Sequence, residues 1–306
     1  SQLYHEHQRG IDAGYAKYET FPIWNLPLNH PVNIAYEAAT VDLDDANIID
    51  PFHLEAYNKI AVNYNRDIEI YPVLNALFEG IYGSNPYKSP TDMGVNMAGY
   101  AIVDDDACRD AARLEIVRRY FAAAVHLKRT GTGEEQVERL RSIMNRAGVT
   151  PDLSPARAVA LEKEAATGAP AGAMVLPDGH VVTGKTGDLL GAASALLMHA
   201  LKAVTGVDET IPVIDDAAIE PICRLKTEHL NSVNRRLHSD ETLIALSITS
   251  ATSPVAARVI DGLKQLRGCD AFFSVIISST DEALYRKLGI NVCCEPKYER
   301  VSLYHR

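Results

Sequence analysis

The apolar pattern of the chain changes at about residue 168, and this change constrains the fold more than any other feature of the sequence. Before it, apolar residues recur at the spacing of amphipathic helices, as in residues 111–127, where Val117 and Phe121 share one stripe. After it, short apolar runs alternate with helical stretches. Because 306 residues exceed the usual size of a single core, we expect two subdomains.

The first half of the chain predicts helices joined by ordered loops. Asp50 can cap a short helix whose first position is Pro51, since the fixed φ of proline suits that position. Further helices are expected at residues 67–82, 135–147 and 155–166. We therefore assign residues 31–167 to a mainly helical subdomain.

The second half, residues 168–306, predicts an α/β sandwich. The runs AGAMVL and HVVTG flank the turn PDG as a β-hairpin, and residues 187–204 form an almost wholly apolar, buried helix. Parallel strands are expected to begin at residues 243, 271 and 290, with helices at 254–266 and 281–288 between them. Together these elements predict a three-layer α/β/α sandwich, in an order similar to that of the cytidine-deaminase fold.

Composition and charge exclude several classes of protein. Apolar residues make up 47% of the chain and charged residues 23%, as in ordinary globular proteins. The formal net charge of −10 argues against a broad surface for nucleic acid or an anionic membrane, because both require clustered Lys and Arg. No apolar run reaches the ~20 residues that span a bilayer, and the five cysteines form no CxxC pair. We expect a cytoplasmic protein whose adjacent Cys293 and Cys294 are core thiols.

Single polar residues lie between apolar ones from His30 to Asn96, and each must find a hydrogen-bond partner or face a ligand. This segment therefore predicts the functional site. The candidates for acid–base catalysis are Asp50, His53, Asp67 and Asp92, and those for binding an anion or cofactor are Asn63, Arg66, Lys88 and Asn96. The alternative is a buried polar network that fixes the packing of the helices.

Residues 179–186 satisfy the spacing GxxxxGK[ST] of a phosphate-binding P-loop. Their β-branched run HVVT instead favours an extended strand after a hairpin turn, so we expect a strand that leads into a helix. A weaker phosphate role remains, because Lys185 and Thr186 would lie at the amino end of the buried helix, which favours an anion. The loops 249–254 and 278–282 would also end at the amino ends of helices, at the carboxyl edge of the sheet. The alternative is that Thr186, Ser253 and Thr280 simply cap their helices.

A third polar cluster covers residues 234–239, with two adjacent arginines, Arg235 and Arg236. They could bind phosphate or carboxylate bidentately, or pair with acidic residues at a domain contact. Metal chemistry is poorly supported. His53 and Glu55 supply the H-x-E half of a zinc-deaminase motif, but the sequence contains neither P-C-x-x-C nor HExxH.

Several long phrases carry a resemblance to a known family: NHPVNIAYEAATVDL, LPDGHVVTGKTGDLLGA, NRRLHSDETLIALSIT and KLGINVCCEPKYE. From residue 1 to 304 the chain resembles the uncharacterised bacterial family called domain of unknown function 1846, or the UPF0371 group. The resemblance implies no established activity. It implies a longer protein, in which a further domain with a glycine-rich, lysine-containing turn precedes residue 1. The chain would then be the C-terminal portion, and residues 1–30 would continue from that domain.

The leading hypothesis is an enzyme, or the substrate-binding half of one, that acts on a small phosphorylated or nucleotide-like metabolite in a cleft between the two subdomains. The sequence specifies no cofactor. The rival hypothesis is a non-catalytic assembly module whose polar stretch forms a subunit interface. The expected partners are accordingly a small anionic ligand, a second copy of the chain and the front domain of the same protein.

Overall fold

The computed structural model describes residues 2–17 and 22–299, which divide into two compact units. The first unit comprises residues 1–120 and 133–150, and the second comprises residues 121–132 and 151–306. Helix α5 (Asp105–Thr130) contributes residues to both units. The expected front segment 1–30 and sandwich 168–306 both include residues outside the described ranges.

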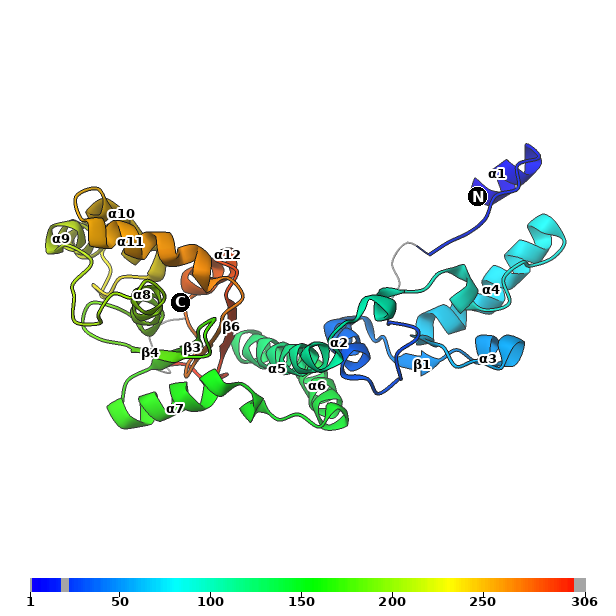
Figure 1. The fold of residues 1–306 in the computed structure, drawn as a ribbon, viewed down its shortest axis with the longest axis horizontal. Helices are drawn as coiled ribbons and strands as arrows, with labels where there is room; N and C mark the ends of the chain where they lie inside the picture. Colours follow the sequence, from blue (N-terminus) through cyan, green and yellow to red (C-terminus); the bar gives the residue numbers. More distant parts are fainter. Residues whose placement is uncertain (1, 18–21, 300–306) are drawn as a thin grey trace. The chain divides into compact units, whose positions relative to one another are not determined.

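The first unit consists mainly of helices (Figure 1). Besides part of α5, its helices are α1 (Gln2–Gln8), α2 (Pro31–Ala39), α3 (Pro51–Tyr57), α4 (Asn65–Tyr82) and α6 (Glu134–Ala147), with 3-10 turns at Val41–Leu43, Pro90–Met93 and Ala98–Ala101. A small antiparallel sheet of β1 (Asn47–Ile49) and β2 (Val62–Tyr64) joins them, and the sequence analysis did not predict it. The predicted helices that begin at Pro51 and near residues 67 and 135 are confirmed.

Local sequence explains the two helices that follow the strands β1 and β2. The Asp50 side chain accepts hydrogen bonds from the backbone N–H groups of Phe52 and His53, so it caps α3. Helix α4 continues through Pro72, which is exposed, while Tyr71 and Phe78 lie two turns apart on its buried face. These two rings and Met93 form a small apolar core.

The second unit contains a four-stranded sheet in the order β4-β3-β5-β6. The strands are β3 (Ala171–Val175), β4 (Val181–Lys185), β5 (Asp270–Phe273) and β6 (Asn291–Cys294). Strand β3 pairs antiparallel with both β4 and β5, and only β5 and β6 are parallel. The helices are α7 (Pro155–Thr167), α8 (Ala192–Val204), α9 (Asp216–Arg224), α10 (Ser239–Ser250), α11 (Pro254–Asp261) and α12 (Ser279–Lys287), with a π-helical turn at Leu225–His229 and 3-10 turns at Pro151–Leu153 and Gly262–Leu266.

Helices α7 and α8 lie on opposite sides of this sheet (Figure 1). Gly172 pairs with Gly184 across β3 and β4, and a Cβ at either position would collide with its surroundings, which include Leu196 of α8. Side chains alternate along a strand, so Met174 faces the same way and shares a core with Leu196. The small residues of the hairpin therefore allow the apolar helix to pack closely on the sheet.

The strand predicted at residue 243 is wrong, because residues 239–250 form helix α10. Its buried residues lie at helical spacing: Thr242, Ala245, Leu246 and Thr249. A helix start also precedes the run, since the Glu241 side chain accepts the His238 backbone N–H at 2.8 Å. The expected set of three parallel strands is therefore reduced to the pair β5 and β6, and the order of elements expected for the sandwich is not reproduced.

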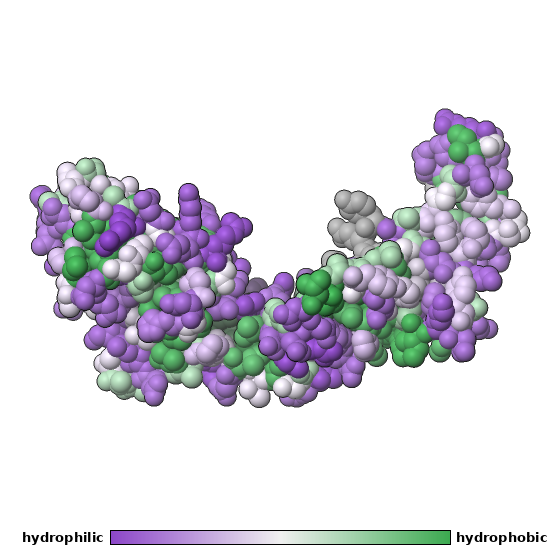
Figure 2. Space-filling model, viewed as in Figure 1, coloured by the Kyte–Doolittle hydropathy of each residue, from purple (hydrophilic) through white to green (hydrophobic). Residues whose placement is uncertain are grey.

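Two other boundaries differ from the prediction. Helix α8 begins at Ala192 rather than at residue 187, and the run after residue 271 stays extended only to Phe273. Figure 2 shows hydrophilic residues over most of the viewed face, interrupted by small apolar patches. Among the helices of the described ranges, none combines the length and the apolarity that a bilayer crossing requires.

Candidate functional site

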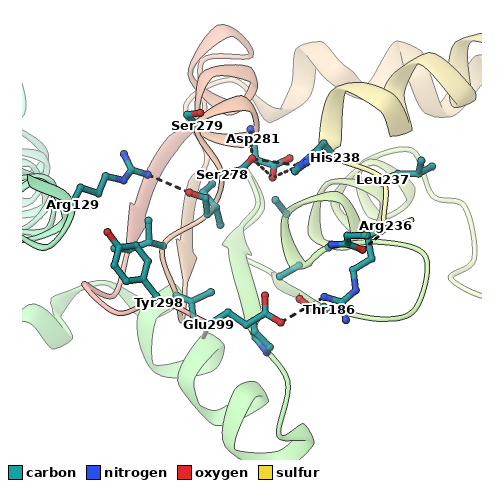
Figure 3. A pocket seen from close by; sticks show the side chains of 18 residues that line it. Arg129, Thr186, Arg236, Leu237, His238, Ser278, Ser279, Asp281, Tyr298 and Glu299 are labelled. Carbon is teal, nitrogen blue, oxygen red and sulfur yellow. Dashed lines mark hydrogen bonds and ion pairs between the residues drawn. The ribbon is translucent and has the colours of Figure 1, made fainter. Parts of the chain in front are cut away.

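A cavity of about 470 Å³ lies in the second unit, beyond the carboxyl end of β5 (Figure 3). Its wall combines basic, acidic, hydroxyl and apolar groups. The residues that matter to its chemistry are Arg129, Thr186, Gly191, Ala192, Ala193, Arg236, Leu237, His238, Ile277, Ser278, Ser279, Asp281, Tyr298 and Glu299. This volume is within the usual range of small-molecule sites.

Three helices begin at the wall of this cavity: α8 at Gly191, α10 at His238 and α12 at Ser278. Hydrogen bonds hold these ends together. The Ser194 hydroxyl donates to the Leu237 carbonyl at 2.8 Å, which joins α8 to the start of α10. The amino end of a helix carries free N–H groups and a partial positive charge, so their convergence favours an anion.

The amino end of α8 differs from the other two ends. Ser278 caps α12 and Glu241 reaches back to cap α10, whereas no side chain of the described residues caps α8. Gly191, Ala192 and Ala193 all line the cavity. Their N–H groups precede the first intrahelical bond, which Ala195 donates to Gly191. A ligand in the cavity can therefore accept hydrogen bonds from this helix end.

His238 and Asp281 form an ion pair at the amino end of α12 (Figure 3). The ring Nδ1 lies 3.2 Å from Asp281 Oδ2 and 3.4 Å from Ser278 Oγ. The ionised carboxylate can only accept, so Nδ1 carries the proton. Nε2 is then the ring nitrogen that can contact a ligand. A carboxylate that fixes the tautomer of a histidine in this way is typical of acid–base sites.

Asp281 is almost fully buried, at 7% exposure, yet burial does not neutralise it. Burial alone would raise its pKa, but hydrogen bonds from His238, Ser239 and Ser278 hold the pKa below its ordinary value. The same Asp281 hydrogen bond raises the pKa of His238, against the effect of its partial burial. Both groups are therefore ionised at pH values between 3.8 and 6.5, which are the ordinary pKa values of the two side chains.

Two arginines complete the basic part of the cavity. Arg129 donates to Glu282 Oε2 at 2.9 Å and to the Ile277 carbonyl at 3.2 Å. Arg236 lies opposite, with its Nη1 at 3.6 Å from Glu299 Oε1 (Figure 3). The alternative for the 234–239 cluster was that its arginines pair with acidic residues at a domain contact. The acidic pairing is confirmed for both, since Arg235 lies 3.8 Å from Glu220, but the domain contact is not. Both ion pairs lie within the second unit.

The polar residues predicted in the first half form a separate network in the first unit. Asp50 uses both carboxylate oxygens: Oδ1 accepts two N–H groups of α3, and Oδ2 accepts the Thr91 hydroxyl at 2.6 Å and the Thr91 N–H at 3.2 Å. The Asn63 amide also donates to Thr91 Oγ1, at 3.4 Å. With four hydrogen bonds already accepted, Asp50 supports the structural alternative rather than catalysis.

His53 and Asp92 lie at the edge of the same network. The His53 ring is 3.0 Å from Ser89 Oγ and 3.7 Å from Asp92 Oδ1. Asp92 Oδ2 accepts the Tyr57 hydroxyl at 2.9 Å and the Lys88 backbone N–H at 2.8 Å. The Lys88 ammonium lies over the Tyr57 ring. Five of the eight predicted residues are thus brought together: Asp50, His53, Asn63, Lys88 and Asp92.

The other three predicted residues of this half lie elsewhere. Arg66 donates to the buried Asp45 carboxylate at 2.8 Å. Asp67 accepts from Lys17 at 2.6 Å. Asn96 accepts the Ala98 N–H at 2.9 Å and so stabilises a local turn. These hydrogen bonds join none of the three to the network around Asp50, and none of the eight predicted residues lines the cavity of the second unit.

The P-loop spacing at residues 179–186 is a hairpin strand, as predicted. Gly179 occupies the turn with a φ of 82°, and residues 181–185 pair with β3. The strand does not lead directly into a helix, because Gly191 is the first residue of the α8 cap. Lys185 is exposed, and Thr186 lines the cavity but does not cap α8. Ser253 does cap its helix, whereas α12 is capped by Ser278 rather than by Thr280.

No group of three metal-binding side chains was found within the described ranges. Cys294 is buried in the core, and burial raises the pKa of its thiol to about 12, so it is an unreactive thiol. Cys293 is only partly buried, which departs from the expectation that both are core residues.

Sequence reasoning found part of this cavity and missed part. It singled out the cluster 234–239 for its two adjacent arginines, and the loop 278–282 because helix starts after strand ends attract ligands. It did not pair His238 with Asp281, and it missed Arg129 and Glu299. Arg129 stands in the last turn of a long helix, where a basic residue normally needs no special explanation, so no local signal existed.

Two family models match the chain: "Domain of unknown function DUF1846, N-terminal" at residues 1–148 and "Domain of unknown function DUF1846, C-terminal" at residues 152–304. The chain therefore spans both family domains, and the expectation that it is only a C-terminal portion is corrected in this respect. UPF0371 proteins of Corynebacterium efficiens, Corynebacterium urealyticum and Streptococcus pyogenes are 55%, 52% and 49% identical over 306 residues. These matches cover the whole chain and 62% of each relative's length.

Proposed function

We propose the following function for the chain, which belongs to the DUF1846 family of unknown function: its second unit binds a small phosphate-bearing metabolite in the cavity and forms part of an enzyme active site. One observation carries the proposal. Three helix amino ends, two arginines and the His238–Asp281 pair meet at a single cavity. Such an arrangement favours a dianion over a neutral ligand.

His238 is the proposed acid–base residue. Asp281 holds Nδ1, so Nε2 can donate a proton to a ligand oxygen or accept one from a ligand hydroxyl. The raised pKa of His238 extends protonation of the ring to higher pH, which also favours contact with a phosphate. The proposed phosphate subsite is the uncapped amino end of α8, which lines the same cavity as this ring and the arginines. The apolar side chains of Leu237 and Ile277 and the ring of Tyr298 would contact the body of the ligand.

Thermal unfolding of the chain with a panel of phosphomonoesters and inorganic phosphate tests the proposal. A ligand at 100 times its Kd stabilises the folded protein by roughly 2.7 kcal/mol, which a melting curve detects easily. His238→Ala should remove the shift. His180→Ala is the matched control, because His180 is exposed in the hairpin turn and does not line the cavity.

The rival hypothesis of an assembly module predicts a different result. If no phosphate-bearing compound raises the melting temperature of the wild-type chain, and the chain instead self-associates with increasing concentration, the catalytic proposal fails. A shift that survives His238→Ala would place the ligand at another site.

A further inference from the structure

The three basic side chains of the cavity, Arg129, Arg236 and His238, differ in how closely acidic partners bind them. His238 and Arg129 each have close hydrogen-bond partners in the wall, at 3.2 Å to Asp281 and at 2.9 Å to Glu282. Among the residues that the structure describes, the Arg236 guanidinium has only the 3.6 Å approach to Glu299, which is too long for a hydrogen bond of good geometry. Both of these side chains remain partly exposed, at 32% and 28%. The ion pair of Arg236 is therefore the most easily exchanged of the three.

The backbone of Arg236 is fixed although its guanidinium is not. Its carbonyl accepts the ammonium of the buried Lys226 at 2.5 Å, and its N–H donates to Asn234 Oδ1 at 2.9 Å. The following N–H, of Leu237, donates to the Leu189 carbonyl at 2.8 Å. These bonds keep the guanidinium at the cavity whichever anion it contacts.

Glu299 approaches the cavity from the segment after β6. The backbone of this segment is bound at Lys297, whose carbonyl accepts the Ile276 N–H at 2.8 Å and whose side chain donates to Glu164 at 2.7 Å. Glu299 lies two residues beyond this attachment and places its carboxylate beside Arg236 (Figure 3). A carboxylate at that point occupies the position where a ligand anion would meet the guanidinium.

We propose that Glu299 is a built-in competitor for the anion subsite, an inference that rests on the proposed function. The Glu299 carboxylate pairs with Arg236 until a ligand phosphate takes its place. A phosphate can bind the guanidinium bidentately with short hydrogen bonds, whereas the carboxylate is held at ion-pair distance only. Arg236 is therefore paired with Glu299 when the cavity is empty and with phosphate when a ligand is bound. Because an anion must displace the carboxylate, the affinity of the cavity for weakly binding anions is lowered.

Glu299→Gln tests this inference by isothermal titration of the whole chain with inorganic phosphate at low ionic strength. Exposed ion pairs contribute little, so we expect phosphate to bind about two- to fivefold more tightly to this variant than to the wild type. Glu220→Gln is the matched control. It removes the same charge from the equally loose pair with Arg235, outside the cavity, and should leave the affinity unchanged.

A double-mutant cycle assigns the effect to Arg236. In the Arg236→Gln background, Glu299→Gln should no longer tighten phosphate binding, because the competing pair is already absent. Unchanged or weaker binding by Glu299→Gln overturns the competitor role. An equal gain with Glu220→Gln overturns it as well, since the effect would then reflect net charge alone.

The results also separate this inference from the proposed function. Phosphate binding by the wild type that is lost in His238→Ala but unaffected by Glu299→Gln leaves the site intact and removes the competitor. If neither the wild type nor Glu299→Gln binds phosphate, both proposals fail together. Binding seen only with Glu299→Gln supports both.

Discussion

Asp281 is the residue on which the geometry of the cavity depends. Its two oxygens accept hydrogen bonds from the ring of His238, from the backbone and hydroxyl of Ser239 and from the hydroxyl of Ser278. The first two residues start α10 and the third caps α12. One buried carboxylate therefore joins two helices and orients the proposed acid–base residue.

The His238–Asp281 pair predicts a pH dependence of stability. The pKa of His238 is raised above 6.5, so its contribution is fully present below that value and is lost as the pH rises through the raised pKa. The pKa of Asp281 is lowered below 3.8, so the contribution is also lost as the pH falls through that lowered value. Asp281→Asn should abolish the loss of stability that accompanies a rise in pH through the pKa of His238.

Urea denaturation of both proteins from about pH 5.5 to about pH 8.5 measures this difference. The wild type should lose more of its unfolding free energy over this range than the variant. Parallel curves for the two proteins would show that the pair does not stabilise the fold. His180→Ala serves as the control, because it removes an exposed histidine that lies outside the cavity.

The network around Asp50 predicts a structural effect of Thr91. Thr91→Val removes the hydroxyl that donates to Asp50 Oδ2 at 2.6 Å, inside a fully buried site. The carboxylate then lacks one of its four donors, and we expect a loss of about 1–3 kcal/mol in unfolding free energy. Thr167→Val is the control, because its exposed hydroxyl donates only to a carbonyl of its own helix. Equal stability of the two variants would contradict the assignment.

At the scale of elements, the α8–hairpin contact predicts a marked effect of one glycine. A Cβ at Gly184 would overlap the backbone of Leu196, which cannot move without shifting α8. Overpacking of this kind costs about 1–3 kcal/mol, so Gly184→Ala should lower the midpoint of chemical denaturation accordingly. Gly187→Ala, with no atom within 4 Å of its Cβ, should leave it unchanged. If Gly184→Ala leaves the midpoint of chemical denaturation unchanged, helix α8 and the β3–β4 hairpin are not in close contact.

The elements show where sequence patterns suffice and where they fail. Helices α3, α4, α6 and α7 and the β3–β4 hairpin follow from caps, prolines, glycines and apolar spacing, all of which are local signals. Helix α10 was mistaken for a strand because LIALSIT is short, apolar and β-branched, and such runs are ambiguous between buried helix and strand. The helix start at Ser239, Asp240 and Glu241 was the signal that decides it.

The candidate site was harder to predict than the elements for a physical reason. Arg129, the segment with Arg236 and His238, and Glu299 come from three places that only the tertiary fold brings together. The first-half polar residues, in contrast, are close in sequence and looked like a site for that reason. Their hydrogen bonds are mostly used within the network, as expected for residues that fix helix packing.

At the scale of the whole chain, the two units have separate cores, so we expect a ligand to change the thermal unfolding of each unit separately. Trp24, the chain's only tryptophan, lies in the first unit, where its ring packs near His53. Saturating inorganic phosphate should therefore raise the unfolding temperature of the second unit, measured by calorimetry. The unfolding midpoint of the first unit, measured by Trp24 fluorescence, should stay unchanged. An equal rise by both probes would show that the units unfold as one.

The glycines of residues 179–186 bear on how sequences of unknown function are interpreted. Two unrelated demands place them: a tight turn requires a positive φ at Gly179, and the approach of a helix leaves no room for a side chain at Gly184. Their separation is the length of one β-strand, and it happens to equal the spacing of a nucleotide-binding signature. A motif search would therefore report a false positive for this chain and direct attention away from the cavity at His238. Hairpins packed against a helix are a general source of such coincidences, and the residues between the glycines distinguish them.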